Sequence, residues 1–375
     1  MKISNRIVTV NRTPVFSGKN VLTEMEGMIR NLHPTGVFIL VDPNTQKHCL
    51  PILTNRSGFF DNSRIICIDG GENSKSLANA EKIWQQLLEA GADRSSLLVN
   101  LGGGVVSDLG GFVAAGYKRG IRYVNVPTSL IGQADASVGG KTAVNIGNLK
   151  NQVGFFYAAA GVFISPEFLK SLPAAHLRSG LAEVVKCLLI GDEAGWNRLS
   201  GHSVDELLQL PLDGGFWSKL VLHAVHYKNK LVMRDFREAN HRKALNFGHT
   251  IGHALESFSM QQNETALLHG EAVAAGMICA SYLSFIKTGL PGSALEKITK
   301  YLVSGFPPFP VDESSIPALM DKIHQDKKHN NRKTQFSLIS KPGHPVINVE
   351  CNEEEITDAV RYYNSALKGS FSPGD

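Results

Sequence analysis

Apolar residues in the first half of the chain form short runs rich in β-branched side chains, and amphipathic stretches separate these runs. Such runs predict buried strands, whereas the helical periodicity of residues 73–92 predicts a helix. A second helix is expected over residues 108–120. Because strand, helix and strand alternate at this spacing, the strands should pair in parallel through right-handed crossovers, as in a doubly wound, Rossmann-like α/β domain. The predicted strands are 37–42, 64–69, 96–104 and 121–129.

Beyond residue 172 the short apolar runs give way to helical periodicity. We therefore predict two domains, an α/β domain over residues 1–172 and a mainly α-helical domain over residues 173–375. The periodic stretches are 174–191, 216–235, 249–258, 269–289 and 353–369.

Composition narrows the class of protein. Of the 375 residues, 43% are apolar and 19% are charged, which is typical of a soluble globular protein with room for two domains. A dispersed net charge of +4 does not favour nucleic acid, and no apolar run has the length of a membrane span. The first residues lack the apolar core of a signal peptide, and the five scattered cysteines include no CxxC pair. We therefore expect a cytoplasmic protein with reduced cysteines and no nucleic-acid or membrane partner.

A glycine-rich loop, "LGGGVVSDLGGF", follows one predicted strand and opens the next helix. Its three consecutive glycines let the backbone approach a phosphate at the helix N-terminus. The spacing differs from the GxGxxG of the common dinucleotide fingerprint, so a tight strand-to-helix turn explains the glycines alone equally well. Asp42, however, ends an earlier strand, where a carboxylate can bind ribose hydroxyls. Together with polar groups in two further loops, these residues indicate a nicotinamide dinucleotide site. The further polar groups are Glu72, Lys75, Thr128 and Ser129.

Three histidines and one glutamate are candidates for a metal site, namely His249, His253, His269 and Glu183. A single histidine on an apolar helix is usually a core residue, but four such groups on small or apolar segments are harder to explain structurally. Two histidines four residues apart without the glutamate of HExxH exclude a zincin protease. Three of the four would complete a catalytic site for zinc, or for cobalt or manganese as substitutes. Spacing alone does not decide between His249 and His253.

Polar groups also cluster in otherwise apolar or glycine-rich stretches. Lys141 and Lys186 have apolar neighbours, so we expect both to be buried, and a buried ammonium needs an anion. A phosphate and a carboxylate on a substrate would supply such anions. For Lys327 and Lys328 alone, a solvated surface position is the simpler interpretation. Further candidates are Asp135, Lys150, Asn151, Lys228 and Arg242.

Nine segments, in this order, resemble the 3-dehydroquinate synthase family of sugar phosphate cyclases and cover the chain roughly from Asp42 to Lys328. The resemblance implies a lyase of the shikimate pathway of aromatic amino acid biosynthesis, which depends on NAD and on zinc or cobalt. It would convert 3-deoxy-D-arabino-heptulosonate 7-phosphate, a phosphorylated sugar acid, to 3-dehydroquinate and phosphate, by transient oxidation, β-elimination of phosphate, re-reduction and intramolecular aldol closure. The segments are "GGGVVSDLGGF", "YKRG", "PTSL", "DASVGGKTAVN", "LKNQVG", "GLAEVVK", "LNFGHTIGHALES", "LLHGEAVAAGM" and "DKK".

The same resemblance implies a role for each candidate residue. The implied metal ligands are Glu183, His249 and His269, and the implied catalytic residues are Lys141, Lys186, His253, Asn246, Asp135 and Lys228. The implied substrate-binding residues are Arg119, reaching into the neighbouring subunit of a homodimer, with Asn151, Arg242 and Lys327 or Lys328. NAD would contact Asp42, Glu72, Lys75, Gly104, Val105, Val106, Ser107, Asp108, Thr128, Ser129, Lys150, Phe168 and Ser171.

The resemblance also gives a reason for the polar positions of residues 241–257. Arg242, Asn246, His249 and His253 lie at spacings of four, three and four, so we expect them to line one face of a helix. That face would be a wall of the active site. Some residues depart from the commonest family pattern, among them Ser107 and Ser129, but none of these departures removes an implied ligand.

Three alternative functions remain at this stage. A sister cyclase acting on sedoheptulose 7-phosphate or glucose 6-phosphate would share the fold, the metal and NAD, although Arg242 and Asn246 favour a carboxylated substrate. A metal-dependent polyol or alcohol dehydrogenase would accumulate NADH. A catalytically silent NAD-binding protein would not need the intact set of Glu183, Lys186 and the three histidines.

Overall fold

The computed structural model describes residues 6–10, 13–18, 20–55, 58–147, 149–212, 215–261, 266–326 and 334–370. The chain forms two compact units. Unit 1 comprises Met1–Pro173 and Pro211–Arg237, and unit 2 comprises Ala174–Leu210 and Glu238–Asp375. Within the described ranges, no helix combines the length and the apolar character needed to cross a membrane.

The first crossing of the chain from unit 1 to unit 2 lies next to the boundary expected at residue 172. The expected division did not include the return of the chain to unit 1, where helix α9 (Gly215–Arg234) contacts β1 and the turn Gly132–Ala136. Periodicity identified α9 as a helix with one apolar face, but it carries no information on which unit covers that face.

Unit 1 is built on a seven-stranded sheet with the order β1-β2-β9-β6-β5-β3-β4. Only the edge pair β1 and β2 is antiparallel, and the other five pairs of neighbours are parallel. The four strands predicted from the sequence correspond to β3, β4, β5 and β6, which confirms the doubly wound α/β fold. The strands are β1 (Arg6–Val10), β2 (Thr13–Ser17), β3 (Val37–Val41), β4 (Arg64–Cys67), β5 (Leu97–Gly102), β6 (Arg122–Pro127) and β9 (Gly161–Ile164).

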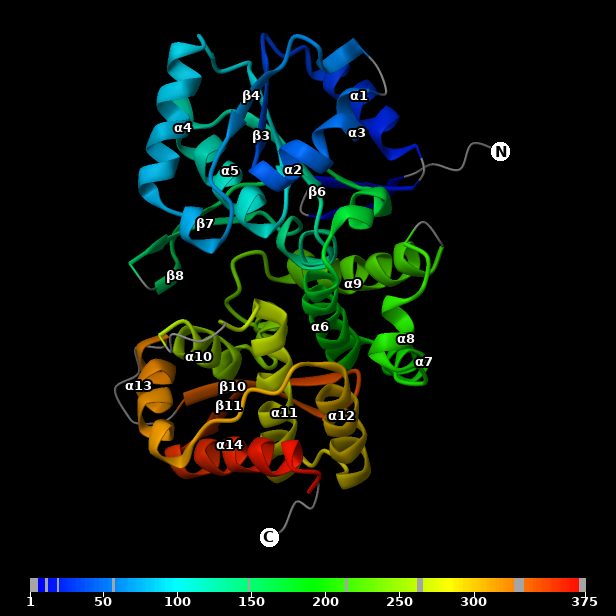
Figure 1. The fold of residues 1–375 in the computed structure, drawn as a ribbon, viewed down its shortest axis with the longest axis vertical. Coiled ribbons are helices and arrows are strands. Elements are labelled where there is room, and N and C mark those ends of the chain that lie inside the picture. Colours follow the sequence, from blue (N-terminus) through cyan, green and yellow to red (C-terminus); the bar gives the residue numbers. More distant parts are fainter. Residues whose placement is uncertain are drawn as a thin grey trace. The chain divides into compact units, whose positions relative to one another are not determined.

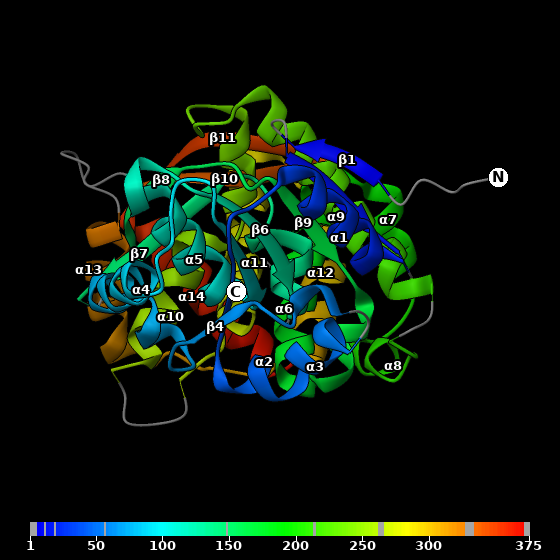
Figure 2. The ribbon, with the colours of Figure 1, turned by 90° about the horizontal axis from the view of Figure 1, so that it is seen from above.

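Helices cover both faces of this sheet. In Figures 1 and 2, α4 and α5 lie on one side of the labelled strands, and α1 and α3 lie on the other. The hairpin β7–β8 forms a separate two-stranded antiparallel sheet, and its first strand contacts α5. The elements are α1 (Val21–Leu32), α2 (Pro43–His48), α3 (Leu50–Thr54), α4 (Leu77–Glu89), α5 (Gly104–Gly116), β7 (Lys141–Ile146) and β8 (Leu149–Phe156).

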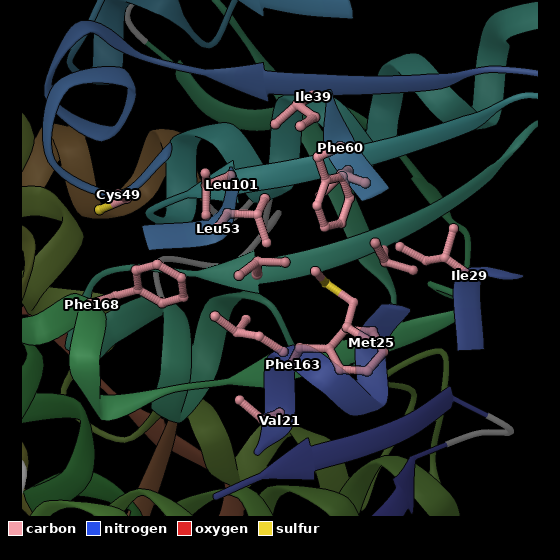
Figure 3. Packing of buried hydrophobic residues seen from close by; sticks show 14 of the residues in the cluster. Val21, Met25, Ile29, Ile39, Cys49, Leu53, Phe60, Leu101, Phe163 and Phe168 are labelled. Carbon is pink, nitrogen blue, oxygen red and sulfur yellow. The ribbon is translucent and has the colours of Figure 1, made fainter. Parts of the chain in front are cut away.

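The face of the sheet beneath α1 and α3 carries an apolar core. Met25 and Ile29 of α1 pack against alternate strand residues such as Ile39 and Leu101, and Phe163 completes the cluster (Figure 3). These side chains are fully buried, and burial of each contributes about 1.5–3 kcal/mol. Because a strand turns every second residue to the same face, this cluster fixes the register of the sheet.

The opposite face contains a buried polar pair. Asn100 of β5 donates a 2.9 Å hydrogen bond to Asn125 of β6, and Asn125 donates to the Ser137 carbonyl. Helix α5 passes directly over Asn100 at Gly110, where any Cβ atom would collide with the Asn100 side chain. The glycine therefore lets α5 approach the strands closely, and this approach sets the position of the N-terminal turn of α5.

Strand order reverses between β3 and β5, because the chain adds β4 beyond β3 and then returns to place β5, β6 and β9 on the other side. Ligands of open α/β sheets bind outside the carboxyl ends of the strands at such a reversal. Asp42 follows β3 and Gly103 follows β5, so both lie at this point.

Unit 2 is mainly helical, as predicted, with one antiparallel hairpin that the sequence analysis did not identify. Helices α10 and α11 pack closely because Gly276 of α11 lies against the backbone of Gly248, where a Cβ would collide with the Gly248 carbonyl oxygen. The elements are α6 (Ala174–Gly191), α7 (Glu193–Leu199), α8 (Val204–Leu208), α10 (His249–Ser259), α11 (His269–Thr288), α12 (Gly292–Gly305), α13 (Ile316–Asp326), β10 (Thr334–Lys341), β11 (His344–Cys351) and α14 (Glu353–Leu367).

Candidate active site

The stretch 241–257 is not a single helix, so the expected common face of Arg242, Asn246, His249 and His253 is wrong. Residues His241–Asn246 form a 3-10 helix, and α10 begins only at His249. The break lies at Gly248, whose φ of 78° is in the left-handed region. A glycine in an apolar helical pattern can mark such a break. The break at Gly248 was not predicted from the sequence.

Three histidines nevertheless meet at the start of α10 and α11. His249 and His253 lie one turn apart on α10, and His269 is the first residue of α11. One ring nitrogen from each lies within 4.8 Å of the others. The close packing of α10 on α11 therefore brings together residues that are 20 positions apart in the chain, from His249 to His269.

Glu183 of α6 joins this group. Its Oε1 lies 3.3 Å from Nε2 of His249 and 3.1 Å from Nε2 of His269. Its Oε2 lies 2.5 Å from the Lys186 ammonium, one turn further along α6, and both side chains are 1% exposed. The expected burial of Lys186 is confirmed, and its partner is a carboxylate of the same helix.

The charges in this group shift the pKa of its members. Burial acts to raise the pKa of Glu183, but Lys186 and the two histidines hold it well below its ordinary value. Burial and the neighbouring Lys186 ammonium lower the pKa of His249 to about 4. Burial also acts to lower the pKa of His269, but hydrogen bonds with Glu183 and Glu256 raise it to about 10. At neutral pH the group therefore offers an ionised carboxylate and a neutral His249.

Two further groups orient the imidazoles. Nδ1 of His249 lies 3.2 Å from the Phe247 carbonyl oxygen, and Nδ1 of His269 lies 3.2 Å from Oε2 of Glu256. The sequence analysis did not identify Glu256, although its position seven residues after His249 on an apolar helix was a usable signal.

A carboxylate oxygen and imidazole nitrogens that converge in this way are donors suited to zinc or cobalt. The cluster therefore fits a divalent cation. Glu183, His249 and His269 touch one another, and His253 stands beside them. The division of roles implied by the resemblance stays a prediction.

Arg242 and Asn246, the polar residues that precede α10, both belong to unit 2. The Arg242 side chain is buried, with 2% exposure. Asn246 donates a 2.9 Å hydrogen bond to Glu238, a residue with a positive φ of 60° that the sequence analysis did not identify.

In unit 1, three residues predicted to surround NAD lie just beyond the carboxyl ends of neighbouring strands, namely Asp42 after β3, Gly104 after β5 and Thr128 after β6. Asp42 caps α2 by accepting the Thr45 N–H, and the Thr128 N–H donates to the Gly102 carbonyl. Gly104 opens α5, whose first N–H groups point out of the helix end and can bind an anion.

A network of charged and amide side chains connects the loop after β4 with α5 and the β7–β8 hairpin. The Lys75 ammonium lies 2.5 Å from both Asp108 and Asn151. Asn145, which the sequence analysis did not identify, donates to Glu72, and Lys150 lies 3.9 Å from the same carboxylate. Burial raises the pKa of Asp108, and Lys75 opposes this effect.

Several predicted NAD contacts are buried in unit 1. Phe168 belongs to the apolar core, and Val106 and Ser107 are 1% and 3% exposed. Val105 is half-buried, as is Ser129, whose hydroxyl accepts the Gly132 N–H. The Ser171 hydroxyl donates to the Phe168 carbonyl.

The expected burial of Lys141 is wrong, because the residue is exposed. Its neighbours Thr142 and Val144 are buried, and Thr142 lies against α5 at Gly111. Since side chains of a strand alternate between faces, Lys141 points away from α5. Apolar neighbours in a strand therefore did not imply burial.

The remaining predicted residues have different settings. The Lys228 ammonium of α9 lies 2.5 Å from Asp135, so the structure brings these two predicted residues together. Arg119 is exposed and has a positive φ of 68°. Lys327 and Lys328 lie outside the described residues.

Comparison with known proteins identifies the family. Residues 65–179 match the family model of the 3-dehydroquinate synthase N-terminal domain, and residues 180–329 match that of the C-terminal domain. The chain belongs to the 3-dehydroquinate synthase family. It is 36% identical over 349 residues to a 3-dehydroquinate synthase of Parabacteroides distasonis, covering 93% of this chain and 97% of that one. It is 37% identical over 342 residues to a 3-dehydroquinate synthase of Chlorobaculum parvum, covering 89% and 90%.

Several solved structures share the fold of this chain. One is a 2-epi-5-epi-valiolone synthase of Streptomyces hygroscopicus with NAD+ and Zn2+ bound, which matches with a TM-score of 0.81 at 25% identity. That match covers 94% of this chain and 96% of the other. A 2-deoxy-scyllo-inosose synthase complexed with carbaglucose-6-phosphate, NAD+ and Co2+ has a TM-score of 0.80 at 22% identity, with 96% and 99% covered. A probable glycerol dehydrogenase of Sinorhizobium meliloti has a TM-score of 0.63 at 16% identity, with 94% and 96% covered. The fold is thus common to cyclases and dehydrogenases, and fold alone does not separate the alternatives.

Proposed function

We propose that the chain is a 3-dehydroquinate synthase, which converts 3-deoxy-D-arabino-heptulosonate 7-phosphate to 3-dehydroquinate and phosphate. The observation that carries this proposal is the convergence of Glu183, His249 and His269 in a member of this family. The family match over both units supports the same substrate in preference to those of the sister cyclases.

We assign the two cofactors to separate sets of residues. When bound, NAD supplies a reversible hydride acceptor, and a divalent zinc or cobalt ion polarises a substrate oxygen. Glu183, His249 and His269 would hold the cation. Asp42 would bind ribose hydroxyls, and the first turn of α5 from Gly104 would bind the pyrophosphate.

The cationic residues would bind the anionic groups of the substrate. Arg242 and Asn246 in unit 2 offer a guanidinium and an amide, which suit a carboxylate or phosphate. In unit 1, Lys141, which is exposed, would bind the phosphate group of the substrate. Asp135 and Lys228 already form a pair, so they would present a fixed donor and acceptor to substrate hydroxyls.

His253 would move protons. It lies beside His249 and His269, with ring centroids 5.1 and 5.6 Å away, and we assign it no ligand role. The reaction otherwise demands positioning more than strong acids and bases, because holding reacting groups in place can itself lower the barrier by several kcal/mol.

We further propose a homodimer in the cytoplasm. The β7–β8 hairpin exposes apolar side chains, which is a feature of surfaces that contact other proteins. Exposed Arg119 would reach the site of the neighbouring subunit, as the resemblance implies. The exposed hairpin residues are Ile146, Val153, Phe155 and Phe156.

The test is to supply the purified protein with 3-deoxy-D-arabino-heptulosonate 7-phosphate, catalytic NAD and zinc, while following phosphate release and NADH absorbance together. We expect phosphate release that EDTA abolishes, without accumulation of NADH, and dehydroquinate as the product. Parallel reactions contain sedoheptulose 7-phosphate or glucose 6-phosphate. Turnover of one of these alone would assign a sister cyclase, and net NADH formation from a simple alcohol would assign a dehydrogenase.

A further inference from the structure

His269 lies between two carboxylates. Its Nε2 is 3.1 Å from Glu183 and its Nδ1 is 3.2 Å from Glu256. Glu183 comes from α6 and Glu256 from α10, so three helices of unit 2 meet at this one imidazole.

Glu256 is a charged side chain in an apolar part of α10. Its side chain is 3% exposed, and its neighbours Ala254, Leu255 and Phe258 on α10 are buried apolar residues. Burying a carboxylate in such a setting is costly unless it is hydrogen-bonded. The contact with His269 offsets that cost.

The contact also determines which nitrogen of His269 can act as a ligand. A carboxylate accepts a proton from Nδ1, so Nε2 is the nitrogen that would give up its proton to a cation and offer its lone pair on the side of Glu183, His249 and His253. His249 is fixed in the same sense, because its Nδ1 lies 3.2 Å from the Phe247 carbonyl. The two imidazoles differ in one respect, namely that His249 is oriented by a neutral group and His269 by a charged one.

We propose that Glu256 is a positioning residue that orients His269 and strengthens its binding of the divalent cation. This inference rests on the proposed function, since it deepens the metal site assigned there. Groups that orient metal ligands in this way typically change metal affinity about 10–100-fold when they are substituted.

Glu271 provides a matched control. It lies two residues after His269 in the same helix, and its carboxylate accepts the Leu268 N–H at the start of α11. The substitution Glu271→Gln removes a charge at a similar place in the chain and keeps an acceptor for that N–H. The substitution Glu256→Gln removes the charge that faces His269 and keeps the size of the side chain.

The experiment measures zinc affinity of the metal-free protein by competition with a chromogenic chelator, together with the visible absorption spectrum of the cobalt-loaded protein. For Glu256→Gln we expect zinc affinity about 10–100-fold weaker and an altered cobalt spectrum, with a thermal midpoint of the metal-free protein close to that of the parent. Glu271→Gln should keep both the affinity and the spectrum. If Glu256→Gln does not fold, Glu256→Asp, whose shorter carboxylate is withdrawn from Nδ1, should show the same loss in part.

Zinc affinity within about threefold of the parent for both Glu256 variants, with an unchanged cobalt spectrum, would overturn the inference. So would a parent protein that binds no zinc. A parent that binds zinc and depends on Glu256 for it, but releases no phosphate from the heptulosonate substrate, would instead overturn the proposed function and leave this inference standing.

Discussion

At the scale of single residues, the buried pair of Glu183 and Lys186 combines structural and functional demands. Both side chains are 1% exposed, and the carboxylate also contacts two histidines. Burying a charge is costly, so each member of the pair depends on the other. A bound cation would give Glu183 a further positive partner.

This dependence predicts how Lys186→Met behaves. The substitution leaves the Glu183 carboxylate buried without its ammonium, so the metal-free protein should lose about 3 kcal/mol, or roughly 5–10 °C of thermal midpoint. Zinc should restore part of the loss, because a cation replaces the missing charge. Calorimetry in EDTA and in excess zinc measures both effects.

Lys300→Met is the control for this substitution. Lys300 pairs with Glu296 on α12, and both side chains are about half exposed, so solvent already screens them. Its thermal midpoint should stay within a degree or two of the parent in either condition. An equal effect of the two substitutions would show that burial of the Glu183 pair is unimportant.

Residue-scale prediction from the sequence succeeded for Lys186 and failed for Lys141. Both have apolar neighbours, but Lys186 lies in a helix buried on every side, whereas Lys141 lies in a strand with only one covered face. Sequence neighbours alone do not distinguish these settings. Glu256 was missed for a related reason, since its partner His269 is 13 residues away.

At the scale of elements, the start of α10 positions His249. Gly248 precedes this helix with a φ of 78°, and a Cβ there would lie 2.5 Å from Cγ of Met277. The residue therefore has both a conformational and a steric requirement for glycine.

We predict that Gly248→Ala separates α10 from α11, lowers the thermal midpoint and weakens zinc binding. Gly289→Ala tests the conformational cost alone, because Gly289 has the same φ of 78° and a Cβ added there would meet open space. It should cost about 1 kcal/mol and leave zinc affinity unchanged. Equal zinc affinity in the two variants, measured by chelator competition, would contradict a role for Gly248 in placing His249.

Element prediction was strongest where periodicity was long. The stretch 174–191 coincides with α6, and 269–289 exceeds α11 by one residue. Two hairpins, β7–β8 and β10–β11, were not predicted from the sequence. The break at Gly248 was missed because the helical spacing of polar residues continues across it.

At the scale of the whole molecule, the exposed apolar side chains of the β7–β8 hairpin bear on assembly. If this surface joins two subunits, Val153→Glu should convert a dimer of 40.7 kDa chains to monomers in light scattering coupled to size exclusion. Ile286→Glu, on the last turn of α11, removes a similarly exposed apolar group and should leave the dimer intact. Monomers in the parent protein, or dimers in Val153→Glu, would exclude this surface.

The return of the chain through α9 constrains how the protein can be built. The chain first forms 37 residues of unit 2, from Ala174 to Leu210, and only then returns to unit 1. This returning segment contains Lys228, the partner of Asp135. During synthesis, unit 1 must therefore wait for residue 237 before its contacts are complete. A gene fragment cut at residue 172 would expose the surface of β1 that α9 covers, and it would be prone to aggregation. Neither unit can be exchanged between relatives by a single crossover, so recombination within this family should tolerate few junctions.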